Sequence, residues 1–205
     1  MASSYSTDLK LELMVTGENA GTWGDKTNTN LNLVQQAVAG FQSIDVASSD
    51  VTLVMTDGTI SNARNAVIKL TGTLAANRTV TCPDTIEKLY TVIDATDHAG
   101  YTLTFKTASG TGALLCEGNT YSLFTDGTNI TKAGELRTWR AISAAETVQA
   151  GAQLLVNTNG GAVTVTLPAS PSTGDQVNFV DQGYDFNSNA LTVGRNSSNI
   201  ANAAA

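Results

Sequence analysis

Short segments rich in valine, isoleucine, threonine and aromatic residues follow one another from residue 51 to residue 194, with turn-forming residues between them. Such residues fit the pleated, half-buried surface of a sheet. Many short strands with few helical patterns are typical of all-β architectures, so we expect a mostly β fold built from small antiparallel, sandwich-like modules. The pattern predicts strands near 51–56, 66–71, 78–82, 89–95, 101–107, 120–125, 137–142, 152–157, 162–167, 175–181 and 190–194.

The tetrapeptide Thr-Asp-Gly-Thr occurs at 56–59 and again at 125–128, each time after an apolar run. An Asp-Gly pair readily adopts the positive φ angles of a type I′ hairpin turn. Both copies therefore predict a turn that joins two antiparallel strands.

Two parts of the β region are similar to each other. The similarity predicts two tandem, related modules at 42–134 and 135–205, and we expect the second to be incomplete at its C-terminus. Chance similarity between two stretches rich in threonine and valine is the alternative. The aligned segments are 78–83 (RTVTCP) with 163–168 (VTVTLP), 89–94 with 176–181, and 101–105 with 189–193.

Residues 1–41 have a different pattern. Apolar residues alternate over 8–15, which predicts a strand or extended arm. A helix is expected at about 27–39, because apolar residues recur there at spacings of three and four. Asp25 or Thr27 is expected to cap its start, and Gly40 its end in a left-handed conformation. The predicted packing surface of this helix consists of Leu31, Val34, Val38 and Phe41.

A glycine-spaced loop precedes the helix, with Trp23 between Gly21 and Gly24. A tryptophan in such a loop can anchor a protein interface. It can equally be a local core residue that holds the arm against the helix of its own chain. Both interpretations remain open from the sequence.

Only 14% of the residues are charged, with 11 basic and 18 acidic side chains and a formal net charge of −7. Nucleic-acid binding needs clustered Lys and Arg to neutralise phosphates, so this balance argues against a nucleic-acid partner. No apolar run approaches the ~18 residues of a membrane helix, and the first residues lack the pattern of a secretory signal. We therefore predict neither nucleic-acid binding nor membrane insertion.

Residues with catalytic or metal-binding chemistry are sparse. Cys82 and Cys116 are too few for a disulfide framework or a zinc site, and we expect both to be buried as small hydrophobes, with a bond between them as the alternative. The single histidine, His98, is expected in an exposed turn. We predict no catalytic residues, no metal site, no cofactor and no enzymatic activity. Four aspartates are expected to form turns instead of binding calcium: Asp94, Asp97, Asp181 and Asp185.

Several stretches of the chain are similar to virion proteins. Residues 5–18 (YSTDLKLELMVTGE), with 21–25 (GTWGD) and 27–31 (TNTNL), resemble an N-terminal segment of tail-fibre-like proteins of tailed bacteriophages, notably marine and cyanobacterial ones. The Gly-Thr-Trp-Gly block is the most specific part. Stretches that resemble β modules of the same proteins are 65–74 with 77–80 and 123–129, and 163–171 with 191–194.

This resemblance implies a homotrimeric, elongated structural protein of the virion that assembles in the host cytoplasm. Residues 1–41 would be the attachment segment, with Gly21, Trp23 and Gly24 docking on tail or baseplate proteins. The two β modules would project toward the host surface. A host glycan, if it is the receptor, would be bound by regions beyond this chain.

Two other functions remain alternatives. A capsid decoration or head-fibre protein would have the same kind of structure at another place in the virion. A carbohydrate-binding module of a host-recognition protein would need exposed aromatic rows on a sheet, and a depolymerase would need a carboxylate pair in a groove. The sparse charge of the chain also suits a durable appendage whose contacts depend little on salt.

Overall fold

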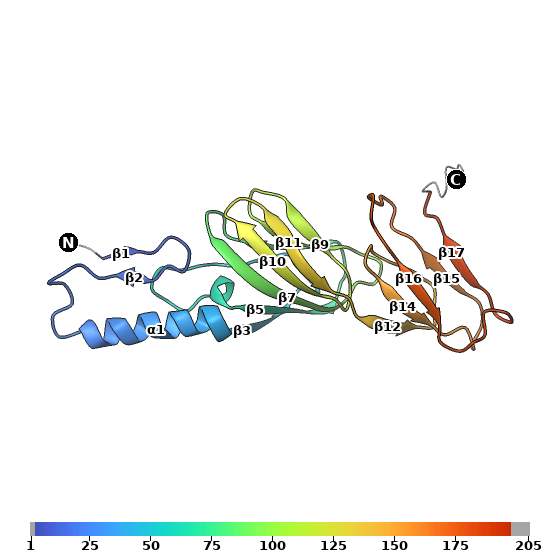
Figure 1. Ribbon diagram of the computed structural model, residues 1–205, viewed down its shortest axis with the longest axis horizontal. Helices are drawn as coiled ribbons and strands as arrows, with labels where there is room; N and C mark the ends of the chain where they lie inside the picture. Colours follow the sequence, from blue (N-terminus) through green and yellow to red (C-terminus); the bar gives the residue numbers. More distant parts are fainter. Residues whose placement is uncertain (1–2, 198–205) are drawn as a thin grey trace.

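The computed structural model describes residues 3–197, and three parts of the chain follow one another along its longest direction (Figure 1). A hairpin and the helix lie at one end, a first group of strands in the middle, and a second group at the other end. The predicted mostly β character is confirmed, and residues 3–197 contain one α-helix. Within that range no helix has the length and apolar character needed to cross a membrane.

The N-terminal arm is a short hairpin in place of the strand expected over 8–15. Strand β1 (Ser4–Tyr5) pairs antiparallel with β2 (Glu12–Leu13), and a turn at residues 7–9 lies between them. Lys10 has a positive φ of 53°, which breaks the extended conformation. The alternating leucines therefore do not continue along a single strand.

Helix α1 (Trp23–Ala39) begins four residues earlier than expected, and neither predicted N-cap is correct. Thr22 occupies the cap position without a side-chain hydrogen bond that caps the helix. Gly40 is not left-handed either, because its φ and ψ are −69° and 141°. A Cβ at this position would lie 2.2 Å from the carbonyl oxygen of Gln36 and 2.5 Å from Oδ1 of Asn65. Close packing is therefore what requires glycine here.

The first group of strands is a two-sheet parallel solenoid, so the expected antiparallel sandwich is wrong here. The chain passes from one sheet to the other and back, and each strand therefore pairs in parallel with the strand two further along the chain. A short 3-10 helix, η1 (Asn62–Arg64), lies between the second and third strands of this group. One sheet contains β3 (Phe41–Asp45), β5 (Val67–Thr73) and β7 (Glu87–Asp97), and the other contains β4 (Val51–Thr52), β6 (Arg78–Cys82) and β8 (Leu103–Thr107).

Antiparallel strands close this solenoid. Strand β9 (Gly112–Leu115) pairs with β8, β10 (Thr120–Asp126) pairs with β7, and β11 (Ile130–Leu136) pairs with β10. The turn at 125–128 joins β10 to β11, as predicted, and Asp126 Oδ1 accepts hydrogen bonds from the amides of Thr128 and Asn129. The other copy, at 56–59, lies in the loop between β4 and η1 and makes no hairpin.

The second group repeats the parallel design. The aligned sequence segments occupy equivalent strands in the two groups: β6 matches β15, β7 matches β16, and β8 matches β17. In each group the first and third of these strands are hydrogen-bonded neighbours. One sheet contains β12 (Trp139–Ile142), β14 (Gln153–Val156) and β16 (Asn178–Asp181), and the other contains β13 (Glu146–Thr147), β15 (Val163–Thr166) and β17 (Leu191–Gly194).

Each group has its own apolar core between its two sheets. Cys82 is buried in the first core, whereas Cys116, at the end of the first group, is buried in the second. Both thiols are free, so the expectation of buried, unbonded cysteines is confirmed. Burial raises the pKa of Cys82 to about 11 and that of Cys116 to about 12.

Lys88 is a charged side chain that points into the first solenoid. Lys88 is buried beside Tyr90, with its Nζ 4.1 Å from the centre of the ring, and it donates hydrogen bonds to the carbonyl oxygens of Asn65 at 2.9 Å and Leu89 at 3.1 Å. Burial lowers the pKa of Lys88 to about 8. The native protein therefore binds this proton less tightly than the unfolded chain does.

Replacement of Lys88 by methionine is expected to change how stability depends on pH. Between pH 8 and about 10.4, the ordinary pKa of lysine, the unfolded chain holds a proton that the native protein has released. The contribution of Lys88 to stability therefore rises with pH in this window. The free energy of unfolding of the wild type, relative to Lys88→Met, should increase by on the order of 3 kcal/mol across it. Urea unfolding of both proteins at several pH values measures this, and parallel curves would contradict it.

Candidate functional site

Helix α1 and Phe41, the first residue of β3, leave an apolar strip uncovered, although its four residues are those predicted to pack. Leu31 is 61% exposed, Val38 75% and Phe41 57%, and Val34 is also exposed. In the helix, Leu31, Val34 and Val38 have the spacing of three and four residues that a and d positions have in a coiled coil, and Phe41 follows them on β3. We call these four residues the helix seam. No other part of residues 3–197 covers them, so their packing partner stays a prediction.

A different side of α1 faces its own chain. Leu33 is buried on this side. The side-chain amide of Asn30 donates a hydrogen bond to the carbonyl oxygen of Glu12 at 2.8 Å and accepts one from the backbone amide of Glu12 at 3.0 Å. The Glu12 carboxylate also lies 2.9 Å from Nζ of Lys26. These contacts hold the helix against the arm and orient the helix seam outward.

Arg64 of η1 is fully buried and joins the arm, the helix and the loop that precedes η1. Burial lowers the pKa of its guanidinium, which has no carboxylate among the hydrogen-bond partners found for it. The neutral acceptors compensate the charge with several hydrogen bonds. They are Leu9 O at 3.0 Å, Gln36 Oε1 at 3.3 Å, Ser61 Oγ at 2.9 Å, Thr56 O at 2.7 Å, and Thr59 O.

Trp23 is the first residue of α1, and its side chain is 63% exposed. It is therefore not a core residue of its own chain, which was one of the two interpretations. Gly21 has a positive φ of 84° in the turn before the helix, while Gly24 lies in the first turn of α1. The loop thus presents the indole at the end of the molecule that carries the helix seam.

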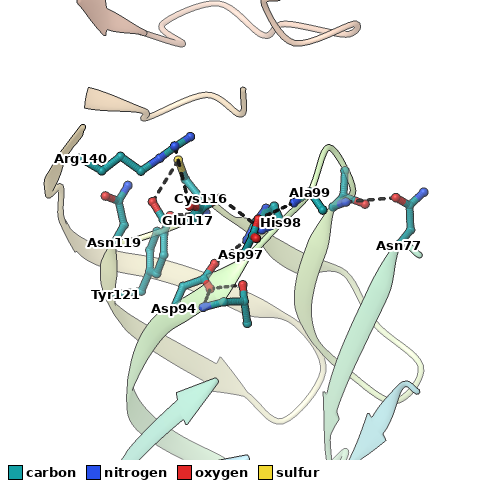
Figure 2. A network of polar contacts seen from close by, with 12 residues as sticks. Asn77, Asp94, Asp97, His98, Ala99, Cys116, Glu117, Asn119, Tyr121 and Arg140 are labelled. Atoms are coloured by element: carbon teal, nitrogen blue, oxygen red, sulfur yellow. Dashed lines mark hydrogen bonds and ion pairs between the residues drawn. The ribbon is translucent and has the colours of Figure 1, made fainter. Parts of the chain in front are cut away.

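A second polar cluster lies where the two groups of strands meet (Figure 2). His98 is buried and not in an exposed turn, which corrects the prediction. Its Nε2 lies 2.8 Å from Oδ2 of Asp94, which is also buried, and its amide donates to Oε2 of Glu117 at 3.1 Å. Asp94 Oδ1 accepts two hydrogen bonds from Thr96. Asp94 therefore holds buried groups together, whereas Asp97, Asp181 and Asp185 accept hydrogen bonds in turns, as predicted.

Arg140 of β12 connects this cluster to the second group. It makes a bidentate ion pair with Glu146, in which Nη1 donates to Oε2 at 2.8 Å and Nη2 donates to Oε1. Its Nη1 also lies 3.7 Å from Oε1 of Glu117. Burial raises the pKa of the Glu117 carboxyl. A cavity of about 700 Å³ adjoins these side chains, lined by residues 97–100, Glu117, 140–147 and Thr166. The arrangement fastens the closing strands of the first solenoid to the first strand of the second.

Sequence reasoning missed this junction because its members come from four segments that no local pattern relates. Only the acidic turn around His98 was visible, and its neighbours Glu117 and Arg140 are 19 and 42 residues away. Within residues 3–197 no group of three or more His, Cys, Asp or Glu side chains is arranged to hold a metal ion.

No family model matches this sequence, and neither a curated protein nor a solved structure is detectably similar to it.

Proposed function

We propose that this chain is a structural protein of a bacteriophage virion, a tail fibre or its virion-proximal portion, and that it has no catalytic activity. The observation that carries the proposal is the exposed Trp23 and helix seam at one end of an elongated chain of parallel β turns. In this function residues 1–41 attach to tail or baseplate proteins, and the two solenoids project toward the host surface.

The helix seam supports assembly into a homotrimer. Exposed apolar residues at a and d spacing are covered when parallel copies of a helix pack together. Each buried side chain of this size contributes about 1.5–3 kcal/mol relative to exposure. The rest of α1 offers little electrostatic support, because Asp25 and Lys26 are its only charged residues.

Trp23→Ala tests the docking step without disturbing the solenoid. Because the indole is exposed, the variant is expected to fold and assemble normally, yet to be incorporated into particles at least tenfold less, since buried tryptophans at interfaces often contribute 2 kcal/mol or more. Quantitative mass spectrometry of purified particles measures the occupancy. Tyr184→Ala is the matched control, because Tyr184 is an exposed aromatic residue of the second solenoid. Normal occupancy of Trp23→Ala would contradict docking through this residue.

The place of the protein in the virion is tested by electron microscopy of particles that carry a gold-labelled copy. Label at the tail agrees with the proposal, whereas label on capsomers alone would favour a head fibre or capsid decoration. The fold and the helix seam are equally consistent with that alternative, so only the image separates the two locations.

A further inference from the structure

The two sheets of each solenoid have different outward-facing residues. In the sheet of β4, β6 and β8, the residues that alternate with the buried ones are mostly threonines, and the same is true of the sheet of β13, β15 and β17. Threonine suits a strand surface that faces water. We call these two surfaces the threonine faces. Their residues include Thr52, Thr79, Thr81, Thr104, Thr147, Thr164, Thr166 and Thr192.

The opposite sheets carry more apolar residues on their outward surfaces, interspersed with threonines and charged residues. Phe41 of β3 is paired with Val67 of β5, and Leu89 of β7 with Phe124 of β10. Leu89 is 56% exposed and Phe124 40%. In β7 the usual arrangement is reversed, because Lys88 is buried while Leu89 faces out. We call this surface of the sheet β11-β10-β7-β5-β3 the apolar face.

The second solenoid shows the same difference. Ala141, Leu155 and Val180 are aligned across β12, β14 and β16, and they alternate with the buried residues of those strands. Thr164 and Thr192 are paired on the opposite sheet. Two solenoids with different sequences thus place apolar residues on the equivalent sheet.

The helix seam continues onto the apolar face, because Phe41 belongs to both. At roughly 150–200 Å² for a large apolar side chain, the exposed fractions of the seam amount to roughly 400 Å² in each chain. A stable interface buries about 800 Å² per partner. The seam alone is therefore too small, and an adjoining apolar surface has to supply the remainder.

We propose that the apolar face packs against the same face in two other copies of this chain, so that the threefold axis follows the helix seam and then this face. The threonine faces then form the outer surface of the trimer. This inference rests on the trimer proposed above and names the surface that forms it. The apolar face also carries charges: Glu87 is paired with Asp126 where β7 begins, Asp45 of the edge strand β3 is paired with Thr71, and Lys69 lies between Ser43 and Ile93.

Two substitutions with matched exposure test this surface. Phe124 is 40% exposed on the apolar face, and Leu114 is 41% exposed on β9, in the opposite sheet. Phe124→Glu is expected to weaken association at least tenfold, measured as molar mass by light scattering over a dilution series, and Leu114→Glu to leave the mass near three times 21.3 kDa. Leu89→Glu provides a second variant on the apolar face. Far-UV circular dichroism confirms that each variant is folded.

The possible results separate this inference from the proposed function. If Phe124→Glu and Leu89→Glu remain trimers while a charge in the helix seam dissociates them, the apolar face is not the interface, although the trimer stands. If Leu114→Glu dissociates the trimer as strongly as Phe124→Glu, the assignment to one face is overturned. A monomeric wild type would overturn the trimer itself, and this inference with it.

Discussion

Arg64→Ala is expected to lower the free energy of unfolding by on the order of 3–5 kcal/mol, because the substitution removes a fully buried side chain and leaves its several hydrogen-bond acceptors without their donor. The guanidinium donates to the backbone carbonyl oxygens of Leu9, Thr56 and Thr59, and the side chain itself is fully buried. Removing one member of a buried hydrogen-bond network leaves its partners unsatisfied, and this lowers stability by more than the intact network contributes. Chemical denaturation followed by tryptophan fluorescence measures the change.

Arg78→Ala is the matched control. Arg78 is only partly buried, and the two hydrogen bonds found for its guanidinium go to a single acceptor, the carbonyl oxygen of Ala47. Its loss should cost about 1 kcal/mol. Arg64→Lys should lie between Arg64→Ala and the wild type, since an ammonium keeps the charge but lacks the planar fork. If Arg64→Ala and Arg78→Ala are equally stable, Arg64 does not join the arm and helix to the solenoid.

Val38→Glu is expected to convert the proposed trimer to a monomer at micromolar concentration, with association weakened by at least 100-fold. Val38 is 75% exposed in the single chain, so the substitution should not disturb folding. In a threefold bundle it would place three carboxylates together in an apolar seam, where both desolvation and mutual repulsion oppose assembly. Sedimentation velocity measures the expected fall from three times 21.3 kDa to one.

Asn32→Glu is the control for this substitution. It adds the same charge to α1, at an exposed position outside the helix seam. The variant should therefore stay trimeric. If both variants remain trimers, the helix seam is not part of the interface. If both dissociate, added charge on the helix is the cause and not the position of Val38.

Sequence patterns predicted where strands lie better than how they pair. Side chains alternate with a period of two in parallel and antiparallel strands alike, so the pattern of Arg78–Cys82 does not distinguish them. Arg78 pairs with Leu103, which lies 25 residues further along the chain, because a strand of the opposite sheet comes between the two paired strands. The internal repeat already reflected this arrangement, since the third aligned segments, 101–105 and 189–193, contain the hydrogen-bonded neighbours of the first ones, 78–83 and 163–168.

Gly40 and Lys88 show why local rules failed at particular residues. Glycine after a helix predicts a left-handed cap, but Gly40 is extended and is needed because Gln36 and Asn65 leave no space for a Cβ. A lysine next to a leucine predicts lysine outside and leucine inside, and β7 has the reverse. Both outcomes depend on neighbours distant in the sequence, which propensity does not include.

The sequence by itself determined the β character of the chain, the presence of a helix near residues 27–39, the burial of both cysteines and the spacing of the helix seam, because these follow from periodicity and side-chain chemistry. Only the tertiary structure decided that the strands form parallel solenoids, that His98 and Arg140 meet at a junction, and that the helix seam stays uncovered. The physical reason is that pairing and burial depend on contacts between segments many residues apart, and those contacts exist only in the folded chain.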